Sequence, residues 1–475
     1  MKNSPFPLHI PSGCSLIILN EEPLHILDWL AIGIYIVLLF GLGFYRNKKE
    51  RDSSSDYILA GRKLSLPGFV ATLVATWYGG ILGVGENTYL YGIQTWFIFS
   101  FPYYVFAILF ALFLAPKIRN KEFSSIPDHF RDHYGPSVGI VSGVLIMILV
   151  SPAPYILSLG ILLNHTLGWE LQPAILISAG FSLMYIWNGG FRSVIRTDIL
   201  QFGLMFFGFI ALLAFVWGLS DGPLTLVSTL PKKFFDPLGG HSIQYILVWF
   251  FIALWTFVDP GFYQRTAAAS SPIIAKKGIL LSVCFWFVFD ILTVTTGLYA
   301  AALFPNLDAV MSYPELASRI LPPFIYGIFL TGLFSTIMST IDSNGFLSAI
   351  TFGRDILLRI NQKDISEEKT HIQKGLVVMA FLAVLLAISI PSIVKLWYVL
   401  GSIIVPGILF PFLLTFTSIR LNESKGVLTL IIPVIVAIGW FYIGKLNGQY
   451  LFNLEPFYPG ILTSAALIGI WKNEI

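Results

Sequence analysis

The sequence is poor in charge and in cysteine, and each shortage excludes a class of protein. Only 12% of its 475 residues are charged, and the formal net charge is +3. Soluble domains carry about 25% charged residues. A net charge this small gives no reason to expect nucleic-acid binding. The two cysteines, Cys14 and Cys284, form neither a disulfide framework nor a metal-binding knuckle.

Several motifs and segments are also missing. The sequence has no GxxxxGK[ST] phosphate-binding loop, which argues against an ATP-driven pump. No hydrophilic stretch reaches the size of a domain, so we expect no attached kinase, nucleotidase or receptor domain. The apolar segments hold no His/Cys/acid cluster and no nucleophile–base pair, and we therefore expect a protein that is not an enzyme.

What the sequence has in abundance is apolar residues. They make up 56% of the chain, and the mean hydropathy is +0.78. This composition predicts an all-α integral membrane protein, since a helix crosses a bilayer with about 20 apolar residues. Thirteen spans are expected, at about 25–45, 66–90, 94–116, 137–164, 172–189, 194–219, 243–262, 278–304, 322–351, 373–390, 393–418, 426–444 and 457–471.

The basic residues predict how these spans are oriented. Lysine and arginine are enriched in cytoplasmic loops. If the N-terminus is outside, all but six of the 29 basic residues fall on the cytoplasmic side. The six are Lys2, Lys232, Lys233, Arg319, Lys395 and Lys445. We therefore expect a multi-pass protein of the cell membrane, embedded in the lipid bilayer, with its N-terminus outside and its C-terminus in the cytoplasm.

The second span contains an unusual run of glycines. Gly79, Gly80, Gly83 and Gly85 lie within seven residues and are followed by Glu86. Glycine destabilises a helix interior, so this run indicates an interrupted helix whose backbone lines a cavity. Close packing of small residues against another helix is the alternative. Glu86 favours the cavity, because a packed glycine seam needs no acid.

The ninth span carries a stripe of oxygen atoms. Thr336, Ser339, Thr340 and Ser343 follow helical spacing and share one face, and Asp342 lies beside them. Hard oxygen donors suit a small alkali cation, and a carboxylate at membrane depth needs a partner or a function. The alternative is that the hydroxyls bond to carbonyls one turn earlier and hold helices together.

Two further acids lie in predicted spans. Asp198 is about one turn into the sixth span, close to Arg192 and Arg196. It is predicted either to serve a function or to pair with one of these arginines. Asp290 lies near the middle of the eighth span, where it is expected to meet a neighbouring hydroxyl or to border a cavity.

Five segments together resemble a known family. They are DYILAGRKL at 56–64, IPDHFRDHYG at 126–135, YIWNGGFRSVIRTDILQ at 185–201, DPGFYQR at 259–265 and STIMSTIDS at 335–343. In this order and spacing they resemble the sodium:solute symporter family, over about residues 25–420.

The resemblance implies a LeuT-type fold with two inverted repeats of five helices. The implied divisions are an extracellular segment 1–24, a first helix and cytoplasmic loop 25–65, a first repeat 66–219, an extracellular loop 220–242, a second repeat 243–420 and two peripheral helices 421–475. The first helix of each repeat is broken in this family. In the seventh span, however, no central glycine marks a break.

The resemblance also implies ion ligands. A primary sodium site would use Ala75, Tyr78, Thr336, Ser339 and Thr340. A possible second cation site would use Asp198, Ser339, Asp342 and Ser343. For Asp342 a second ion, a proton and a purely structural role all stay open.

The implied function is sodium-coupled import of a small organic solute by alternating access. The expected solute lining is Tyr78, Gly79, Gly80, Glu86, Tyr155, Ser158, Gln244, Trp249 and Trp255. No lysine or arginine is expected mid-membrane on these spans, so a strongly anionic solute would rely on helix N-termini. Glu86 suits an ammonium group or several hydroxyls, which favours an amino acid, amine or sugar over a dicarboxylate. The alternatives are proton coupling and a solute sensor that does not transport. No obligate protein partner is evident.

Overall fold

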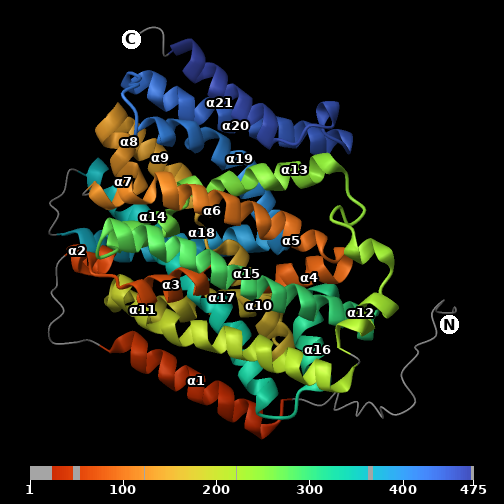
Figure 1. Ribbon diagram of the computed structural model, residues 1–475. Helices are drawn as coiled ribbons and strands as arrows, with labels where there is room; N and C mark the ends of the chain where they lie inside the picture. The colour runs from red at the N-terminus through yellow and green to blue at the C-terminus, as the bar shows by residue number, and fades with distance from the viewer. Residues whose placement is uncertain (1–23, 46–53, 122, 221, 362–366, 472–475) are drawn as a thin grey trace.

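The computed structural model describes residues 24–45, 54–121, 123–220, 222–361 and 367–471, and within them every regular element is a helix. The expected extracellular segment 1–24 lies, apart from Leu24, outside the described residues. Leu64 and Ala269 also form one isolated β-bridge. The helices pack side by side into a single bundle (Figure 1). The predicted all-α class is confirmed.

The elements follow one another along the chain in the order shown by the labels of Figure 1. Their bounds are α1 Ile26–Phe44, α2 Ser54–Leu59, η1 Ala60–Arg62, α3 Leu66–Ala75, α4 Ile81–Tyr91, α5 Gln94–Phe99, α6 Phe101–Phe113, α7 Ala115–Asn120, α8 Ile126–Tyr134, α9 Pro136–Leu149, α10 Ala153–Leu167, α11 Leu171–Leu219, α12 Pro223–Thr229, η2 Lys232–Phe235, α13 Ile243–Ile252, η3 Ala253–Val258, α14 Pro260–Ala268, α15 Pro272–Leu303, η4 Ala309–Met311, α16 Ser312–Ile320, α17 Ile325–Ile350, η5 Thr351–Leu358, α18 Glu368–Ser389, α19 Ile393–Leu414, α20 Glu423–Asn447, η7 Leu451–Asn453 and α21 Phe457–Trp471.

Ten helical stretches of the described chain are long and apolar enough to cross a membrane. Three shorter apolar helices, Leu66–Ala75, Leu171–Phe181 and Phe457–Trp471, fall within other expected spans. Large apolar side chains such as Val37 and Phe381 are 72% exposed, as expected of a surface that faces lipid. The protein is therefore a multi-pass membrane protein, and the number of thirteen crossings stays a prediction.

The predicted interruption of the second span is confirmed. Helix α3 ends at Ala75, α4 begins at Ile81, and residues 76–80 connect them. The glycines allow close approach of other helices: a Cβ atom at Gly80 would lie 1.9 Å from Cζ2 of Trp397. The backbone of this connection therefore lies directly against side chains of the bundle core.

The seventh span is also interrupted, by a different device. Helix α13 ends at Ile252, a 3-10 turn follows, and α14 begins at Pro260. Asp259 caps α14, because its carboxylate accepts the N–H of Phe262 at 2.9 Å. An aspartate followed by proline is a typical start of a helix, so this break does not need a glycine.

Helix α11 carries the fifth and sixth expected spans in one continuous stretch. The chain bends at Gly190, whose φ is +58°. A Cβ atom there would lie 2.6 Å from the backbone oxygen of Tyr57. Glycine thus meets both the backbone and the packing requirements of this bend.

Helix α17, which carries the oxygen stripe, is anchored by α1. The buried Asp28 carboxylate accepts the N–H groups of Phe324 and Gly327, each at 2.9 Å. These donors lie at the start of α17, where N–H groups have no partner within the helix. Asp28 therefore fixes the N-terminal end of α17.

The loops predicted to be cytoplasmic gather at one end of the bundle. Arg192 pairs with Asp56 at 2.6 Å, and Arg354 pairs with Asp128 at 2.8 Å. Helices α2, α7 and α8 lie at this end, and α12 and α16 lie at the opposite end (Figure 1). The grouping of these loops agrees with the basic-residue pattern. Which end faces the cytoplasm stays a prediction.

Candidate functional site

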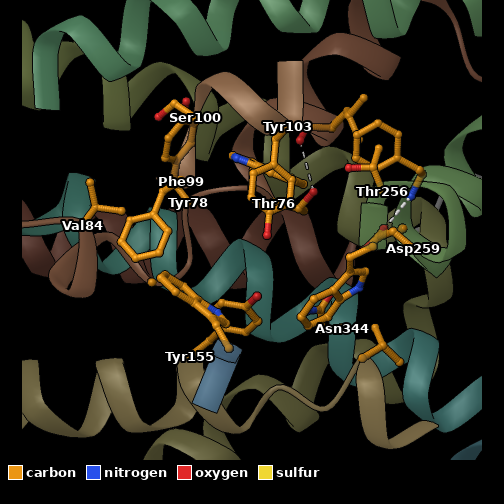
Figure 2. A pocket seen from close by; sticks show the side chains of 18 of the residues that line it. Thr76, Tyr78, Val84, Phe99, Ser100, Tyr103, Tyr155, Thr256, Asp259 and Asn344 are labelled. Atoms are coloured by element: carbon orange, nitrogen blue, oxygen red, sulfur yellow. Dashed lines mark hydrogen bonds between the residues drawn. The ribbon is translucent and has the colours of Figure 1, made fainter. Parts of the chain in front are cut away.

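A cavity of about 110 Å³ lies where the two interrupted helices meet. Figure 2 shows Tyr78, Val84 and Phe99 at one end and Thr256, Asp259 and Asn344 at the other. Its full lining is Leu73, Thr76, Trp77, Tyr78, Gly80, Val84, Phe99, Ser100, Tyr103, Val150, Tyr155, Trp255, Thr256, Asp259, Gly261, Phe262, Arg265, Asp290, Asn344 and Trp397. A few polar groups among aromatic walls are typical of a small-molecule site.

The aromatic wall is built by packing between neighbouring helices. Trp77 lies in the connection after α3, and its ring centroid is 4.8 Å from that of Trp286 on α15 and 4.9 Å from that of Tyr103 on α6. The ring centroids of Tyr155 on α10 and Trp397 on α19 are 6.4 Å apart. The wall thus draws on helices far apart in the sequence.

The structure places four of the expected solute residues in the cavity wall: Tyr78, Gly80, Tyr155 and Trp255. Asp259, Asn344 and Trp397 also line it, although none of them was expected there from the sequence. Asp259 is the one with a sequence signal, because an Asp-Pro pair inside an apolar span marks the start of a new helix.

The remaining five expected solute residues do not line this cavity. They are Gly79, Glu86, Ser158, Gln244 and Trp249. Gln244 donates to the backbone oxygen of Asn453 instead. Trp249 packs against Phe99 with ring centroids 5.0 Å apart. Their positions follow from the helical phase and packing, which composition alone does not give.

Gly79 faces the oxygen stripe of α17 rather than the cavity. A Cβ atom on it would lie 2.4 Å from Cβ and 2.6 Å from Oγ1 of Thr340. The connection between α3 and α4 is therefore in direct contact with α17. All five predicted primary ligands are buried, and they are Ala75, Tyr78, Thr336, Ser339 and Thr340.

The threonine hydroxyls on α17 bond along their own helix. Thr336 Oγ1 donates to the oxygen of Gly332 at 2.7 Å, and Thr340 Oγ1 donates to the oxygen of Thr336 at 3.2 Å. Both threonines therefore make the hydrogen bonds to carbonyls one turn earlier that were the alternative to ion binding. These bonds do not exclude an ion, because a hydroxyl that donates its hydrogen keeps its oxygen lone pairs.

Ser339 belongs to a second group of contacts, which we call the Asp198 cluster: Thr72, Asp198, Arg265, Ser339 and Ser343. Ser339 Oγ donates to Oδ1 of Asp198 at 2.7 Å, and Thr72 Oγ1 donates to Oδ2. Arg265 Nη2 donates to Ser343 Oγ at 2.7 Å and to Thr72 Oγ1 at 3.1 Å. It lies 3.8 Å from Oδ2 of Asp198. All five side chains are buried.

This cluster corrects two expectations. Arg192 pairs with Asp56, and Arg196 donates to the backbone oxygens of Arg192 and Tyr45, so neither is the partner of Asp198. The partner is Arg265, which is 0% exposed and lines the cavity. The seventh span was expected to end at 262, whereas α14 continues to Ala268 and brings the Arg265 side chain into the cavity wall.

The other two acids of interest are also buried. Asp290 accepts a hydrogen bond from the hydroxyl of Tyr104 and lines the cavity, so both environments expected for it are observed. Asp342 is 0% exposed on α17, and its three possible roles stay open. Among the described residues, no group of three or more His, Cys, Asp and Glu could hold a metal ion. The candidate ligands for a cation are instead hydroxyl and carbonyl oxygens.

Two interrupted helices that meet beside a cavity, next to an oxygen-lined helix, are typical of the LeuT-type fold of membrane transporters. The profile described as "Sodium:solute symporter family" matches residues 57–433. The chain belongs to this family, and the resemblance seen in the sequence is confirmed.

Several characterised proteins are similar over nearly the whole chain. The high-affinity choline transporter 1 of Drosophila melanogaster is 24% identical over 90% of this chain and 72% of its own length. The osmoregulated proline transporter OpuE of Bacillus subtilis is 24% identical over 90% and 91% of the two chains. The sodium/pantothenate symporter of Haemophilus influenzae is 24% identical over 92% and 94%.

Solved structures show the same fold. A Na⁺-coupled sialic acid symporter in a substrate-bound, outward-open state has a TM-score of 0.77 and 16% identity, covering 94% of this chain and 96% of its own. A nucleobase-cation-symport-1 family transporter in a closed conformation has a TM-score of 0.59 and 10% identity, covering 89% and 96%. The LeuT-type fold expected from the sequence is confirmed.

Proposed function

We propose that this protein is a sodium-coupled secondary active symporter of the plasma membrane, which imports a small organic solute by alternating access. The observation that carries the proposal is that one segment, the connection between α3 and α4, borders both the cavity and the oxygen stripe of α17. The connection between α3 and α4 borders the cavity through Tyr78 and Gly80 and contacts the oxygen stripe of α17 through Gly79. An ion bound to the stripe and a solute bound in the cavity would thus act on the same segment.

The proposed primary sodium site lies between this connection and α17. Its ligands are the backbone oxygens of Ala75, Tyr78 and Thr336 and the hydroxyls of Ser339 and Thr340. Sodium at this place joins the α3–α4 pair to α17, and it stabilises the conformation in which the two are in contact. Coupling follows because an ion shifts an equilibrium only through its different affinities for the two conformations.

The direction of transport follows from the sodium gradient and the membrane potential. Each positive charge that moves inward releases about 2.3 kcal/mol of free energy per 100 mV of membrane potential. We place the end of the bundle that contains α2, α7 and α8 in the cytoplasm, because the loops richest in lysine and arginine gather there. Solute then enters from the opposite end.

The cavity supports a solute that carries an ammonium group together with an oxygen acceptor, such as an amino acid or a hydroxylated amine, because Arg265 lines the same wall with donors that have no partner within the described part of the chain. Aromatic rings attract ammonium groups through their faces, and Trp77, Tyr155, Trp255 and Trp397 supply such rings here. Asp259 offers a carboxylate in the same wall. The transporters of choline and proline among the relatives agree with this class.

A thermal-shift screen of the purified protein tests the proposal. The panel contains quaternary amines, amino acids and sugars, each measured in sodium and in potassium at the same pH. We expect an ammonium compound to raise the unfolding temperature in sodium and to have little effect in potassium. A ligand that stabilises the protein equally in both salts would contradict sodium coupling and favour proton coupling or a sensor.

A further inference from the structure

We propose that the guanidinium of Arg265 is the resident cation of the Asp198 cluster, so that this cluster holds no second sodium and the protein carries one sodium ion per cycle. The proposal rests on the sodium coupling proposed above and specifies its stoichiometry. It assigns the place of a second metal ion to a side chain of the protein itself.

Arg265 donates directly to Ser343, one of the four residues of the predicted second cation site, and it reaches Asp198, another of the four, through Thr72. Nη2 has two hydrogens, and both are used: one is donated to Ser343 Oγ at 2.7 Å and one to Thr72 Oγ1 at 3.1 Å. The Thr72 hydroxyl in turn donates a hydrogen bond to Oδ2 of Asp198. The guanidinium is thus linked to the carboxylate both through Thr72 and directly across 3.8 Å.

The charges lead to the same conclusion. An arginine side chain stays protonated in proteins, and Arg265 is 0% exposed, so water screens its charge poorly. A sodium ion bound to Asp198 and Ser343 would lie next to this fixed positive charge. Repulsion at such short range opposes the second ion, and the carboxylate of Asp198 is already compensated.

The residues of the Asp198 cluster come from different helices of the bundle. Arg265 lies on α14 and Thr72 lies on α3, which are halves of the two interrupted helices, whereas Asp198 lies on α11 and Ser343 on α17. The guanidinium therefore ties both interrupted helices to the α11–α17 pair. Unlike a free ion, it cannot leave to either side of the membrane.

Ser339 belongs both to this cluster and to the proposed sodium site. Its hydrogen is donated to Asp198 Oδ1 at 2.7 Å, and its oxygen lone pairs stay available to an ion. The primary site can therefore fill while Arg265 stays in place. The other donors of Arg265, Nε and Nη1, are buried and have no hydrogen-bond partner among the described residues. Nη1 lies 3.7 Å from the position of a Cβ on Gly261, a residue of the cavity wall.

Equilibrium binding of ²²Na⁺ to the purified full-length protein tests the assignment by counting ions. We expect one sodium per wild-type molecule and a sodium affinity at least tenfold lower in Thr340→Ala. Arg265→Ala should bind a second sodium, and the double variant Arg265→Ala/Asp198→Asn should return to one. Arg265→Lys keeps a tethered positive charge and should bind one.

The outcomes separate this proposal from the proposed function. Two sodium ions in the wild type would overturn the assignment of Arg265, and this count needs no variant that could fail to fold. An Arg265→Ala protein that is folded and still binds one ion would overturn it too. If the wild type binds no sodium but Arg265→Ala binds an ion that Asp198→Asn removes, sodium coupling fails while the assignment holds. No sodium in either protein would overturn both.

Discussion

Replacing Gly79 by alanine should weaken sodium binding without unfolding the protein. The new Cβ atom would lie 2.4 Å from Cβ and 2.6 Å from Oγ1 of Thr340, and 2.7 Å from Cδ1 of Tyr155. Carbon atoms in contact prefer about 3.5–4.0 Å. The connection between α3 and α4 must therefore move away from α17 by roughly 1 Å. That movement separates the two halves of the proposed sodium site.

The size of the effect follows from the strain of the extra methyl group. Overpacking a buried site by this amount costs about 1–3 kcal/mol. The strain acts on the conformation in which the connection contacts α17, which is the one that binds sodium. Sodium affinity should therefore fall roughly 5- to 150-fold, because every 1.4 kcal/mol changes an equilibrium about tenfold.

Binding of ²²Na⁺ to purified protein measures this directly and needs no knowledge of the solute. Gly203→Ala is the matched control, because Gly203 lies on α11 and a Cβ there meets nothing within 4 Å. Its affinity should equal that of the wild type. A Gly79→Ala protein that binds sodium like the wild type would refute the placement of the ion between the α3–α4 connection and α17.

Three further predictions concern other parts of the molecule. Asp28→Ala removes the acceptor of two N–H groups at the start of α17 and should lower stability by about 2 kcal/mol; an unchanged unfolding temperature would contradict its anchoring role. Arg192→Gln breaks only the pair with Asp56 and should leave the number of bound sodium ions unchanged; a matched loss in Arg192→Gln and Asp198→Asn would contradict the separation of the two sites. Burial lowers the pKa of His129, on α8 outside the spans, from 6.5 to about 3, so the unfolded chain binds a proton that the folded protein does not; stability should fall as the pH drops below about 6.5, by about 2 kcal/mol at pH 5. In thermal unfolding, His129→Gln should show a smaller loss between pH 7 and pH 5 than the wild type, and an equal loss would refute this origin.

Much of the fold was predictable because the membrane imposes strong patterns on sequence. Long apolar stretches and the glycines at Gly79 and Gly80 are local signals, and the structure has helices and an interruption where they predict them. The Asp-Pro start of α14 is also a local signal, but it is easily overlooked in an apolar span without glycine.

The site was only partly predictable because its contacts join distant parts of the chain. Arg265 meets Ser343 across 78 residues and Thr72 across 193. The expected seventh span ends at 262, which places this arginine in a loop. Gln244 was expected in the cavity, yet its side chain donates to the backbone oxygen of Asn453, which is 209 residues further on. Composition indicates which residues could bind something, and packing determines which ones meet.

Uptake into proteoliposomes tests the central claim most directly. The protein is reconstituted, loaded with potassium inside, and given a radiolabelled ammonium solute selected by thermal shift, with either sodium or potassium outside at one pH. An inward sodium gradient should drive transient accumulation of the solute above its equilibrium level, and potassium should not. Equal uptake in the two salts, or sodium-dependent binding of the solute without any uptake, would contradict sodium-coupled import.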